Sequence, residues 1–440
     1  ERIGGDCLND GCVPSKALIH IAKIAKHAQE AEAYGYTVTG KPDIAKAMQY
    51  VKERQDVIRK HENAAVLRKE GMDVELGTAH FVSKNEISVN GTIYSARKIV
   101  LATGSRPSPL TMPGAELVEQ YNNESVFHLE NLPKRIMVIG GGPIGIEIGQ
   151  ALSRLGAEVT IVHRRSEILP HDAPEVAVIL REQLTKEGVK FVLNAEVSAF
   201  TGKNEAVIKL KDDSTFVQQF DAVFVGVGRH FDLTTLKLEN AGIEHDGKKL
   251  IVSPYLETTN KDVFAVGDIA GSLQFSHAAE QHVRMLLNNL FSPLKKKLNN
   301  DHMSWVTFTD PEVATFGISE ADLTKRGKYF EKMVMDFGAD DRAVVDNYRY
   351  GKLVLYVTKG GMLKKQKILG GSMVAPSAGE LIQELILANT SSLSTDAIFN
   401  KIYPYPVASR VNQLILVKDR EKLLSGNINK MLQFFYRLFN

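Results

Sequence analysis

The sequence is poor in cysteine, in tryptophan and in net charge. Its 440 residues include two cysteines and one tryptophan, and the formal net charge is +2. Two cysteines are too few for a secreted scaffold held together by disulfides, and they favour a reducing compartment, so we expect a cytoplasmic location. The small net charge gives no electrostatic case for binding nucleic acid. Because we find neither a signal peptide nor an apolar run long enough to cross a bilayer, we do not expect a membrane partner.

The bulk composition is that of a globular protein with a full core. Hydrophobic residues make up 44% of the chain and charged residues 24%. A chain of this length is expected to fold into two or three domains.

The two cysteines lie close together near the start of the chain. Cys7 and Cys12 are followed by Pro14 and by an apolar pattern with helical spacing. Proline suits the first turn of a helix, so Cys12 is predicted at or just before a helix N-terminus, where the helix dipole stabilises a thiolate. We expect the glycine-containing loop to bring Cys7 over Cys12 as a redox-active dithiol. A static disulfide or a pair of inert buried thiols is the alternative.

A nucleotide-binding pattern occupies the middle of the chain. The apolar strand 135–139 runs into a GxGxxG turn, and a helix and a second strand at 157–162 follow. This is the context that a dinucleotide fingerprint requires. Gly140 permits the tight turn, Gly142 lets a pyrophosphate approach the backbone, and Gly145 packs helix against strand. The phosphates are expected on the helix N-terminus. A glycine-rich turn without a ligand is the alternative.

The end of the second strand bears on the choice of cofactor. Enzymes that use NAD place an acidic residue there for the ribose 2′-hydroxyl. This sequence has His163, Arg164 and Arg165 instead. Cations suit a 2′-phosphate, and guanidinium groups can bind it with two hydrogen bonds, so we expect NADP(H) to be preferred over NAD(H). The alternative is that these are solvated surface charges.

The cysteine segment GGDCLNDGCVPSKAL resembles the active-site segment of the class I pyridine nucleotide-disulfide oxidoreductases. These FAD enzymes include dihydrolipoamide dehydrogenase, glutathione reductase and mercuric reductase. The resemblance implies that Cys7 is the thiol that exchanges with the substrate and that Cys12 is the thiol that faces the flavin. It also implies that Lys16 lies near the flavin and pairs with Glu147. An exposed helix glutamate is the plainer interpretation of Glu147.

Further segments resemble the flavin-binding parts of that family. Thr103 and Gly104 follow an apolar strand, and Gly228 ends a second strand-to-glycine segment. The resemblance implies that these residues approach the FAD and that Asp268, after Gly267, binds the ribityl chain. His277 begins a helix expected beside the flavin, where it is more structural than catalytic.

The resemblance covers nearly the whole chain and implies an α/β fold. It consists of two Rossmann-like domains, for FAD and for NAD(P), and an α+β dimerisation domain that makes the protein a homodimer. The expected FAD-binding domain covers 1–132 and 257–298, the NAD(P)-binding domain 133–256 and the dimerisation domain 299–440. The chain begins inside the cysteine segment, so we expect the first FAD-binding unit to be missing and leave open whether this chain holds FAD.

One segment departs from the pattern of dihydrolipoamide dehydrogenase and glutathione reductase. Tyr405 stands where those enzymes have an acid/base histidine, and Arg410 stands where they have the glutamate that orients it. A tyrosine, with a pKa of about 10, moves protons poorly at neutral pH. Mercuric reductase-like proteins do have a tyrosine here, and a soft metal held by thiolates needs no acid/base group. Yet no cysteine follows Cys12, so delivery of mercury by a C-terminal cysteine pair is not supported. Plain packing is the alternative for Tyr405.

These observations predict a mercuric reductase-like enzyme that passes electrons from NAD(P)H through FAD to a Cys7–Cys12 disulfide. The acceptor is a small molecule, a metal ion or a disulfide, and no resident metal site is expected. A dihydrolipoamide dehydrogenase and a weakly active flavoprotein that senses or binds a partner are the alternatives. An apolar helix is predicted over 428–439. We expect it to pack on the dimer, with a membrane or partner contact as the alternative.

Overall fold

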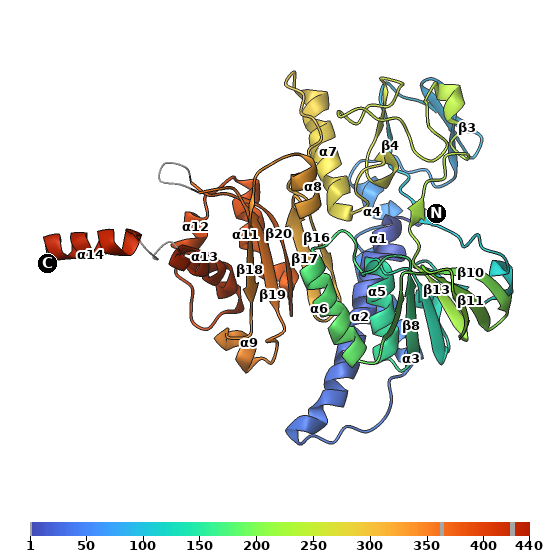
Figure 1. Cartoon of the computed structure of the whole chain (residues 1–440). Coiled ribbons are helices and arrows are strands. Elements are labelled where there is room, and N and C mark those ends of the chain that lie inside the picture. Colours follow the sequence, from blue (N-terminus) through green and yellow to red (C-terminus); the bar gives the residue numbers. More distant parts are fainter. Residues whose placement is uncertain (1, 361–364, 423–426) are drawn as a thin grey trace. The chain divides into compact units, whose positions relative to one another are not determined.

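The computed structural model describes residues 2–360, 365–422 and 427–440. The chain divides into two compact units (Figure 1). The first consists of Glu1–Ser166 and Glu187–Asn299, and the second of Glu167–Lys186 and Asn300–Asn440. None of the described helices is both long and apolar enough to cross a membrane.

The centre of the first unit is a five-stranded parallel sheet with the order β6-β13-β7-β8-β9. Its strands are β6 (Gln120–Tyr121), β7 (Arg135–Ile139), β8 (Glu158–His163), β9 (Lys190–Leu193) and β13 (Ala222–Val225). Nearly continuous apolar runs form the three inner strands, as expected for a sheet covered on both faces. The strand, turn, helix and strand expected from 135 to 162 are confirmed, with α5 over Pro143–Arg154.

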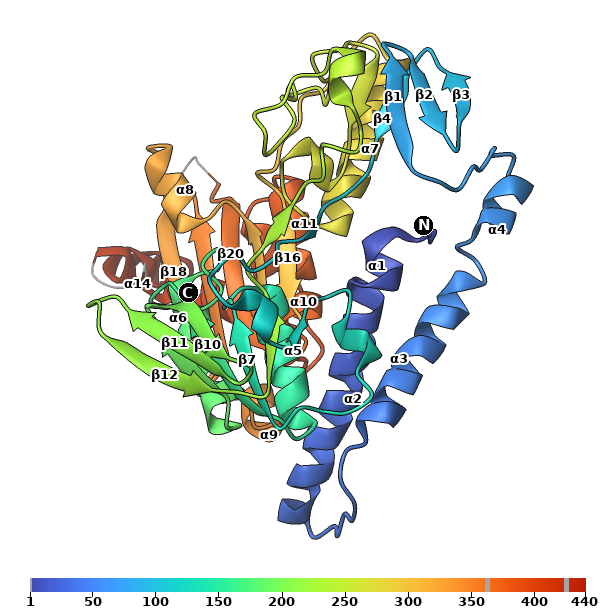
Figure 2. The ribbon, with the colours of Figure 1, turned by 90° about the vertical axis from the view of Figure 1, so that its right-hand side faces the viewer.

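The other helices of the first unit include the two that carry the cysteines. They are α1 (Gly5–Asn9), α2 (Cys12–Glu30), α3 (Ile44–Arg59), α4 (Ala64–Lys69) and α7 (Ser276–Phe291). Figure 2 shows α2 and α3 side by side, and they pack together. Strand β4 (Ile99–Leu101) pairs in parallel with β15 (Val263–Ala265), which brings the segments that follow both strands to one edge.

Antiparallel strands complete the first unit. They are β1 (Ala79–Ser83), β2 (Glu86–Val89), β3 (Thr92–Ser95), β5 (Arg106–Pro107), β10 (Ala195–Gly202), β11 (Glu205–Leu210), β12 (Thr215–Gln219) and β14 (Arg229–His230).

The second unit is an antiparallel sheet with the order β16-β17-β20-β19-β18. Its strands are β16 (Ser304–Thr307), β17 (Glu312–Gly317), β18 (Glu331–Asp336), β19 (Lys352–Val357) and β20 (Ile368–Ala375). Its helices are α6 (Pro174–Lys186), α8 (Glu320–Lys325), α9 (Asp341–Val345), α10 (Ala378–Leu381), α11 (Gln383–Thr390), α12 (Asp396–Phe399), α13 (Val411–Glu421) and α14 (Asn427–Phe439). Helices α6 and α13 pack on the sheet.

Helix α6 comes from the middle of the sequence but packs on strands β17, β19 and β20 of the second unit. Asp172, just before this helix, accepts hydrogen bonds from Trp305 (2.9 Å) and Thr315 (2.5 Å). Lys332 forms an ion pair with Glu175 of α6 at 2.5 Å. The expected domain boundaries stay predictions, since compact packing does not itself mark where a nucleotide-binding fold begins or ends.

Candidate active site

The two cysteines lie on consecutive helices. Cys7 belongs to the short helix α1, whereas Cys12 is the first residue of α2. The expected helix N-terminus at Cys12 is confirmed, but the loop expected around Cys7 is wrong, because that segment is a helical turn. Gly11 separates the two helices, and a Cβ atom there would lie 2.9 Å from the carbonyl oxygen of Asp6. The tight connection therefore requires glycine.

Both cysteines are free thiols, and their environments separate their acidities. The hydrogen bond from Cys7, with smaller contributions from Ser276 and Lys16, lowers the pKa of Cys12 to about 6. The same bond, together with burial, raises the pKa of Cys7. Ser276, the first residue of α7, places its hydroxyl 3.6 Å from the Cys12 sulfur. At neutral pH the pair therefore consists of a Cys12 thiolate that accepts a hydrogen bond from the Cys7 thiol.

Lys16 connects the cysteine helix to the nucleotide-binding pattern. Its ammonium group lies 2.9 Å from the carboxylate of Glu147 on α5. The Glu147 side chain is 6% exposed and that of Lys16 36%. The contact implied by the family resemblance is present, and the plainer interpretation of Glu147 as an exposed glutamate is wrong.

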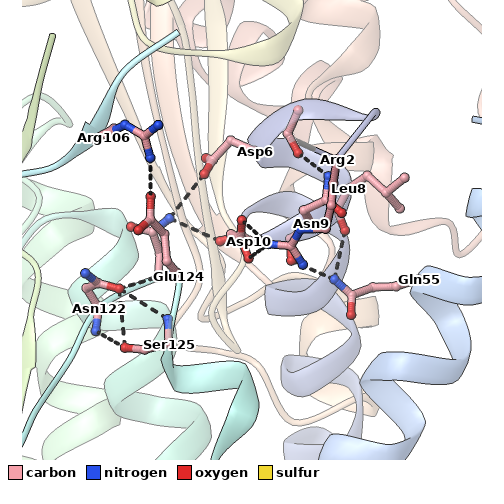
Figure 3. A network of polar contacts seen from close by, with 12 residues as sticks. Arg2, Asp6, Leu8, Asn9, Asp10, Gln55, Arg106, Asn122, Glu124 and Ser125 are labelled. Atoms are coloured by element: carbon pink, nitrogen blue, oxygen red, sulfur yellow. Dashed lines mark hydrogen bonds and ion pairs between the residues drawn. The ribbon is translucent and has the colours of Figure 1, made fainter. Parts of the chain in front are cut away.

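The short helix α1 is held by side chains from outside it (Figure 3). Gln55 of α3 donates hydrogen bonds to the carbonyl oxygens of Leu8 (2.9 Å) and Asn9 (2.7 Å) at the end of α1. Asn123 donates to Asp6 (3.3 Å) and to the carbonyl oxygen of Asp10 (3.1 Å). These bonds satisfy carbonyl groups that the helix itself leaves open, and they fix the segment that carries Cys7.

Arg229 joins the cysteine segment to the segments that resemble flavin-binding motifs. Its guanidinium lies 3.3 Å from Asp6 and donates hydrogen bonds to the hydroxyl (2.6 Å) and the carbonyl oxygen (2.8 Å) of Ser105. Ser105 in turn donates to Asp268 at 2.5 Å. Partial burial raises the pKa of Asp6, and the charge of Arg229 opposes that rise. The positive charge of Arg229 therefore offsets the negative charges of the Asp6 and Asp268 carboxylates.

The neighbouring positions named from the sequence lie around this network. Gly104 directly precedes Ser105 and has a φ of 68°, and Gly267 directly precedes Asp268 and has a φ of 69°. Gly228, which precedes Arg229, has a φ of 115°. Thr103 is exposed. His277 is exposed on α7, and its ring stacks on Phe275 at 5.2 Å.

The glycine-rich turn has the close approaches that the fingerprint requires. A Cβ atom at Gly140 would lie 2.2 Å from the carbonyl oxygen of Gly226, and one at Gly145 would lie 2.2 Å from that of Gly140. Around Gly142 no heavy atom of the described chain comes within 4 Å of such an atom, so the backbone is open to a ligand. No side chain in the described residues caps the N-terminus of α5. The turn therefore fits the pyrophosphate of a dinucleotide.

The three residues after the second strand have different surroundings. His163 is buried, and its Nδ1 accepts a hydrogen bond from the backbone N–H of Gly141 at 3.0 Å. This hydrogen bond holds the backbone of the glycine-rich turn in place. Arg164 and Arg165 are exposed at the end of β8. Of these three side chains, those of the two arginines are exposed and that of His163 is not.

Tyr405 belongs to the second unit and lines a cavity of about 210 Å³ with Asp341, Arg342 and Arg410. Its hydroxyl donates a hydrogen bond to Asp341 at 2.9 Å, and this bond raises the pKa of Tyr405. The guanidinium of Arg410 lies over the Tyr405 ring, 5.7 Å from its centre. Tyr405 is thus a hydrogen-bond donor that keeps its proton at neutral pH.

Several residues of this arrangement were not found from the sequence. They are Asp6, Ser105, Arg229, Ser276 and Asp341. Ser105 and Arg229 contact Asp268, Ser276 contacts Cys12, and Asp341 contacts Tyr405. Asp6 contacts Arg229. Ser276 had a usable signal, since a polar residue opens the helix expected at 277. The others make contacts between segments far apart in the chain, for which the sequence holds no local pattern.

The described residues fit the two cofactors that the family resemblance implies. The α5 N-terminus and Gly142 suit the phosphates of a nicotinamide dinucleotide. Asp268, held in place by Ser105, offers a carboxylate of 22% exposure that can accept hydrogen bonds from ribityl hydroxyls. These residues therefore offer the groups that a dinucleotide-binding flavoprotein needs.

Comparisons with known proteins agree with this arrangement. The family profile described as pyridine nucleotide-disulphide oxidoreductase matches residues 2–282, and that of its dimerisation domain matches residues 303–414. A dihydrolipoyl dehydrogenase from Thermus scotoductus is 33% identical over 93% of this chain and 88% of its own length. A mercuric reductase from Staphylococcus aureus is 30% identical over 96% of this chain and 78% of its own. The solved structure of the HOCl-induced flavoprotein disulfide reductase RclA from Escherichia coli is similar, with a TM-score of 0.80 and 26% identity over 94% of this chain and 91% of that chain.

Proposed function

Because the chain belongs to the pyridine nucleotide-disulphide oxidoreductase family, a flavin-dependent enzyme family, we propose that Cys7 and Cys12 are its redox dithiol. When bound, FAD supplies the two-electron chemistry between a nicotinamide and a disulfide. The observation that carries the proposal is the pair of unequal acidities, with the pKa of Cys12 near 6 and that of Cys7 raised. A thiolate that is stable at neutral pH beside a protonated thiol is what a dithiol needs if one sulfur meets the flavin and the other meets the acceptor.

The roles of the surrounding residues follow from their contacts. Ser276 and Lys16 hold negative charge on Cys12, and Glu147 fixes the position of Lys16. Cys7 keeps its proton until it attacks an acceptor, so it acts as the exchange thiol. Asp6 and Arg229 fix the turn that carries Cys7. Arg164 and Arg165 bind a 2′-phosphate, which makes NADPH the preferred donor.

The acceptor that suits this site does not depend on a histidine acid/base. Tyr405 occupies the histidine position of the resemblance, and its proton is committed to Asp341. We therefore propose a mercuric reductase-like activity in which a thiophilic acceptor, a soft metal ion in the first instance, is held by the Cys7 and Cys12 sulfurs. The two electrons come from NADPH, and the metal ion is reduced while the dithiol returns to its disulfide. The match to the dimerisation domain supports a homodimer, in which Tyr405 would serve the dithiol of the other subunit.

Dihydrolipoamide dehydrogenase is the second candidate, and the 33% identity to a dihydrolipoyl dehydrogenase favours it. It requires proton transfer to and from a dithiol substrate, a task for which Tyr405 and Arg410 are unsuited. The two candidates therefore differ in whether lipoamide is turned over.

The test is an anaerobic titration of the FAD-loaded protein with NADPH, with NADH run in parallel, followed by visible absorbance. We expect a long-wavelength thiolate–flavin band with NADPH, absent in Cys12→Ser and present without reductant in Cys7→Ser, which cannot form the disulfide. Bleaching of the flavin without that band would reject the dithiol proposal in favour of a plain flavin reductase or a sensor.

Acceptor assays then separate the candidates. We expect turnover with one Hg²⁺ ion or with two Cu²⁺ ions for each NADPH oxidised, and little turnover with lipoamide. The double variant Tyr405→His/Arg410→Glu restores the histidine–glutamate pair, and we expect it to gain lipoamide activity. Fast lipoamide turnover by the unaltered protein would overturn the mercuric reductase-like assignment.

A further inference from the structure

The last helix of the chain is α14 (Asn427–Phe439; Figure 1). It carries large apolar side chains that are exposed to solvent. Those described are Met431, Leu432, Phe434, Phe435, Tyr436, Leu438 and Phe439, and their exposures lie between 43% and 77%. The dimerisation-domain match ends at residue 414, before this helix begins. The family profile therefore does not cover these side chains.

The helix has two distinct faces. At 3.6 residues per turn, Met431, Phe435 and Leu438 follow one another along one face. The stacking of the Phe435 and Phe439 rings, 6.3 Å apart, shows that these two side chains share that face. Gln433 and Arg437 lie on the opposite face. This segregation is that of a helix at a boundary between an apolar and an aqueous medium.

The charge of the segment has one sign. From residue 422 onward the charged residues are Lys422, Lys430 and Arg437, and no aspartate or glutamate occurs among them. Arg437, whose side chain the structure describes, lies opposite the apolar face of the helix. A surface that takes up this helix must therefore accept apolar side chains on one side and tolerate or attract cations on the other.

We propose that α14 binds an anionic phospholipid surface and lies in its plane. Thirteen helical residues extend over about 20 Å, which is too short to cross a hydrocarbon core of about 30 Å. Phenylalanine and tyrosine side chains favour the boundary between headgroups and acyl chains, and the cations meet the negative leaflet. The proposal adopts the membrane contact that the sequence left as the alternative for 428–439, in place of the expected packing on the dimer.

The same charges argue against a second copy of α14 as the occupant. Helices that pair in water place opposite charges beside their apolar seam. Two copies of this segment would bring cations to cations, since from residue 422 onward neither copy has an aspartate or glutamate to pair with them. An anionic surface neutralises these charges, whereas a like helix repels them.

The experiment is flotation of the full chain with vesicles of phosphatidylcholine alone or of phosphatidylcholine with phosphatidylglycerol. We expect binding to the mixed vesicles and a decrease with added salt. Phe435→Glu should reduce the partition coefficient at least about tenfold. Arg437→Gln should reduce it about fivefold on the anionic vesicles and little on the neutral ones. The matched control is Phe291→Glu, which places the same substitution at an 85% exposed phenylalanine on α7 and should leave binding unchanged.

Each other outcome overturns the proposal. If the parent protein does not float with anionic vesicles, or if Phe435→Glu and deletion of residues 423–440 float as well as the parent, α14 is not a lipid-binding helix. If the deletion instead converts a dimer into monomers, as measured by light scattering, and the parent does not bind vesicles, the helix belongs to the subunit interface. Thermal unfolding of each variant reports whether its second unit remains folded.

Discussion

The ammonium group of Lys16 lies 2.9 Å from the Glu147 carboxylate and connects the helix that begins at Cys12 with the helix that follows the glycine-rich turn. The carboxylate is nearly buried, so loss of its ammonium partner should destabilise the fold more than loss of a partner in an exposed ion pair. The pair also places a positive charge where it lowers the pKa of Cys12. Stability and thiol acidity therefore depend on the same contact.

Replacing Lys16 by methionine should lower the free energy of unfolding by about 1–3 kcal/mol, because it removes the ammonium partner of a buried carboxylate. The decrease in the free energy of unfolding should lie toward the lower end of this range, since the Lys16 side chain is 36% exposed. Urea unfolding measures the change. Lys16→Arg keeps the positive charge and should lower the free energy of unfolding by less. The double variant Lys16→Met/Glu147→Gln removes the buried charge as well and should recover part of the lost stability. Equal urea midpoints for Lys16→Met and the parent would show that the pair contributes no stability.

The acidity of Cys12 makes the stability of the reduced protein depend on pH. Its pKa of about 6 in the folded chain lies below the ordinary value of 9.0. A group with a depressed pKa stabilises the fold above its unfolded pKa, and that contribution disappears as the pH falls through the folded value. The reduced protein should therefore gain stability from pH 6 to pH 9, whereas Cys12→Ser should lack this part of the dependence.

The same acidity can be read directly from ultraviolet thiolate absorbance. The transition should centre near pH 6, disappear in Cys12→Ser and move upward in Cys7→Ala, since the hydrogen bond from Cys7 contributes most to the lowering. A transition in Cys7→Ala that stays where it is in the parent would contradict the assigned cause.

Removing the guanidinium of Arg229 should disturb the cysteine turn. Arg229→Gln loses the charge that opposes the raised pKa of Asp6 and the hydrogen bonds to Ser105. We expect a loss of about 1–3 kcal/mol in the free energy of unfolding, with a smaller loss in Arg229→Lys. The comparison variant is Arg106→Gln, which alters an exposed arginine nearby and should lower the free energy of unfolding much less than Arg229→Gln does. Identical unfolding curves for the two glutamine variants would mean that the Arg229 contacts carry no special stability.

Coenzyme preference should depend on the exposed arginines after β8. Arg164→Ala is expected to raise the KM for NADPH by about 10–100-fold, because a charge-assisted hydrogen bond to the 2′-phosphate is lost. The KM for NADH should change little. Steady-state kinetics with both coenzymes measure the effect, and Arg97→Ala serves as a control at another exposed arginine. A similar increase for both coenzymes would place Arg164 outside 2′-phosphate recognition.

The parts of the fold that follow a local pattern were predictable from the sequence. The run 135–162 shows a buried strand, a glycine-rich turn, an amphipathic helix and a second strand in direct succession, so local spacing specifies it. The position of Cys12 at a helix N-terminus followed from Pro14. The contact of Lys16 with Glu147 joins residues 131 positions apart, and only the family resemblance pointed to it.

The parts that were missed depend on contacts that no local pattern records. The turn around Cys7 reads as a loop because of its glycines, yet it is helical. Gly4 begins it with a φ of 97°, and Gln55 satisfies the carbonyl groups at its end. The bridge from Asp6 through Arg229 to Asp268 likewise brings together three distant segments, which the sequence could not place beside one another.

Helix α6 means that the chain passes between the two compact units three times, after Ser166, after Lys186 and after Asn299. A gene fragment that starts at Asn300 would encode the antiparallel sheet without the helix that packs on β17, β19 and β20. Trp305 and Thr315 would also lose the carboxylate of Asp172. The second unit is therefore not a transferable cassette. Recombination that exchanges it between relatives must also carry the stretch 167–186, so both units are constrained to evolve together.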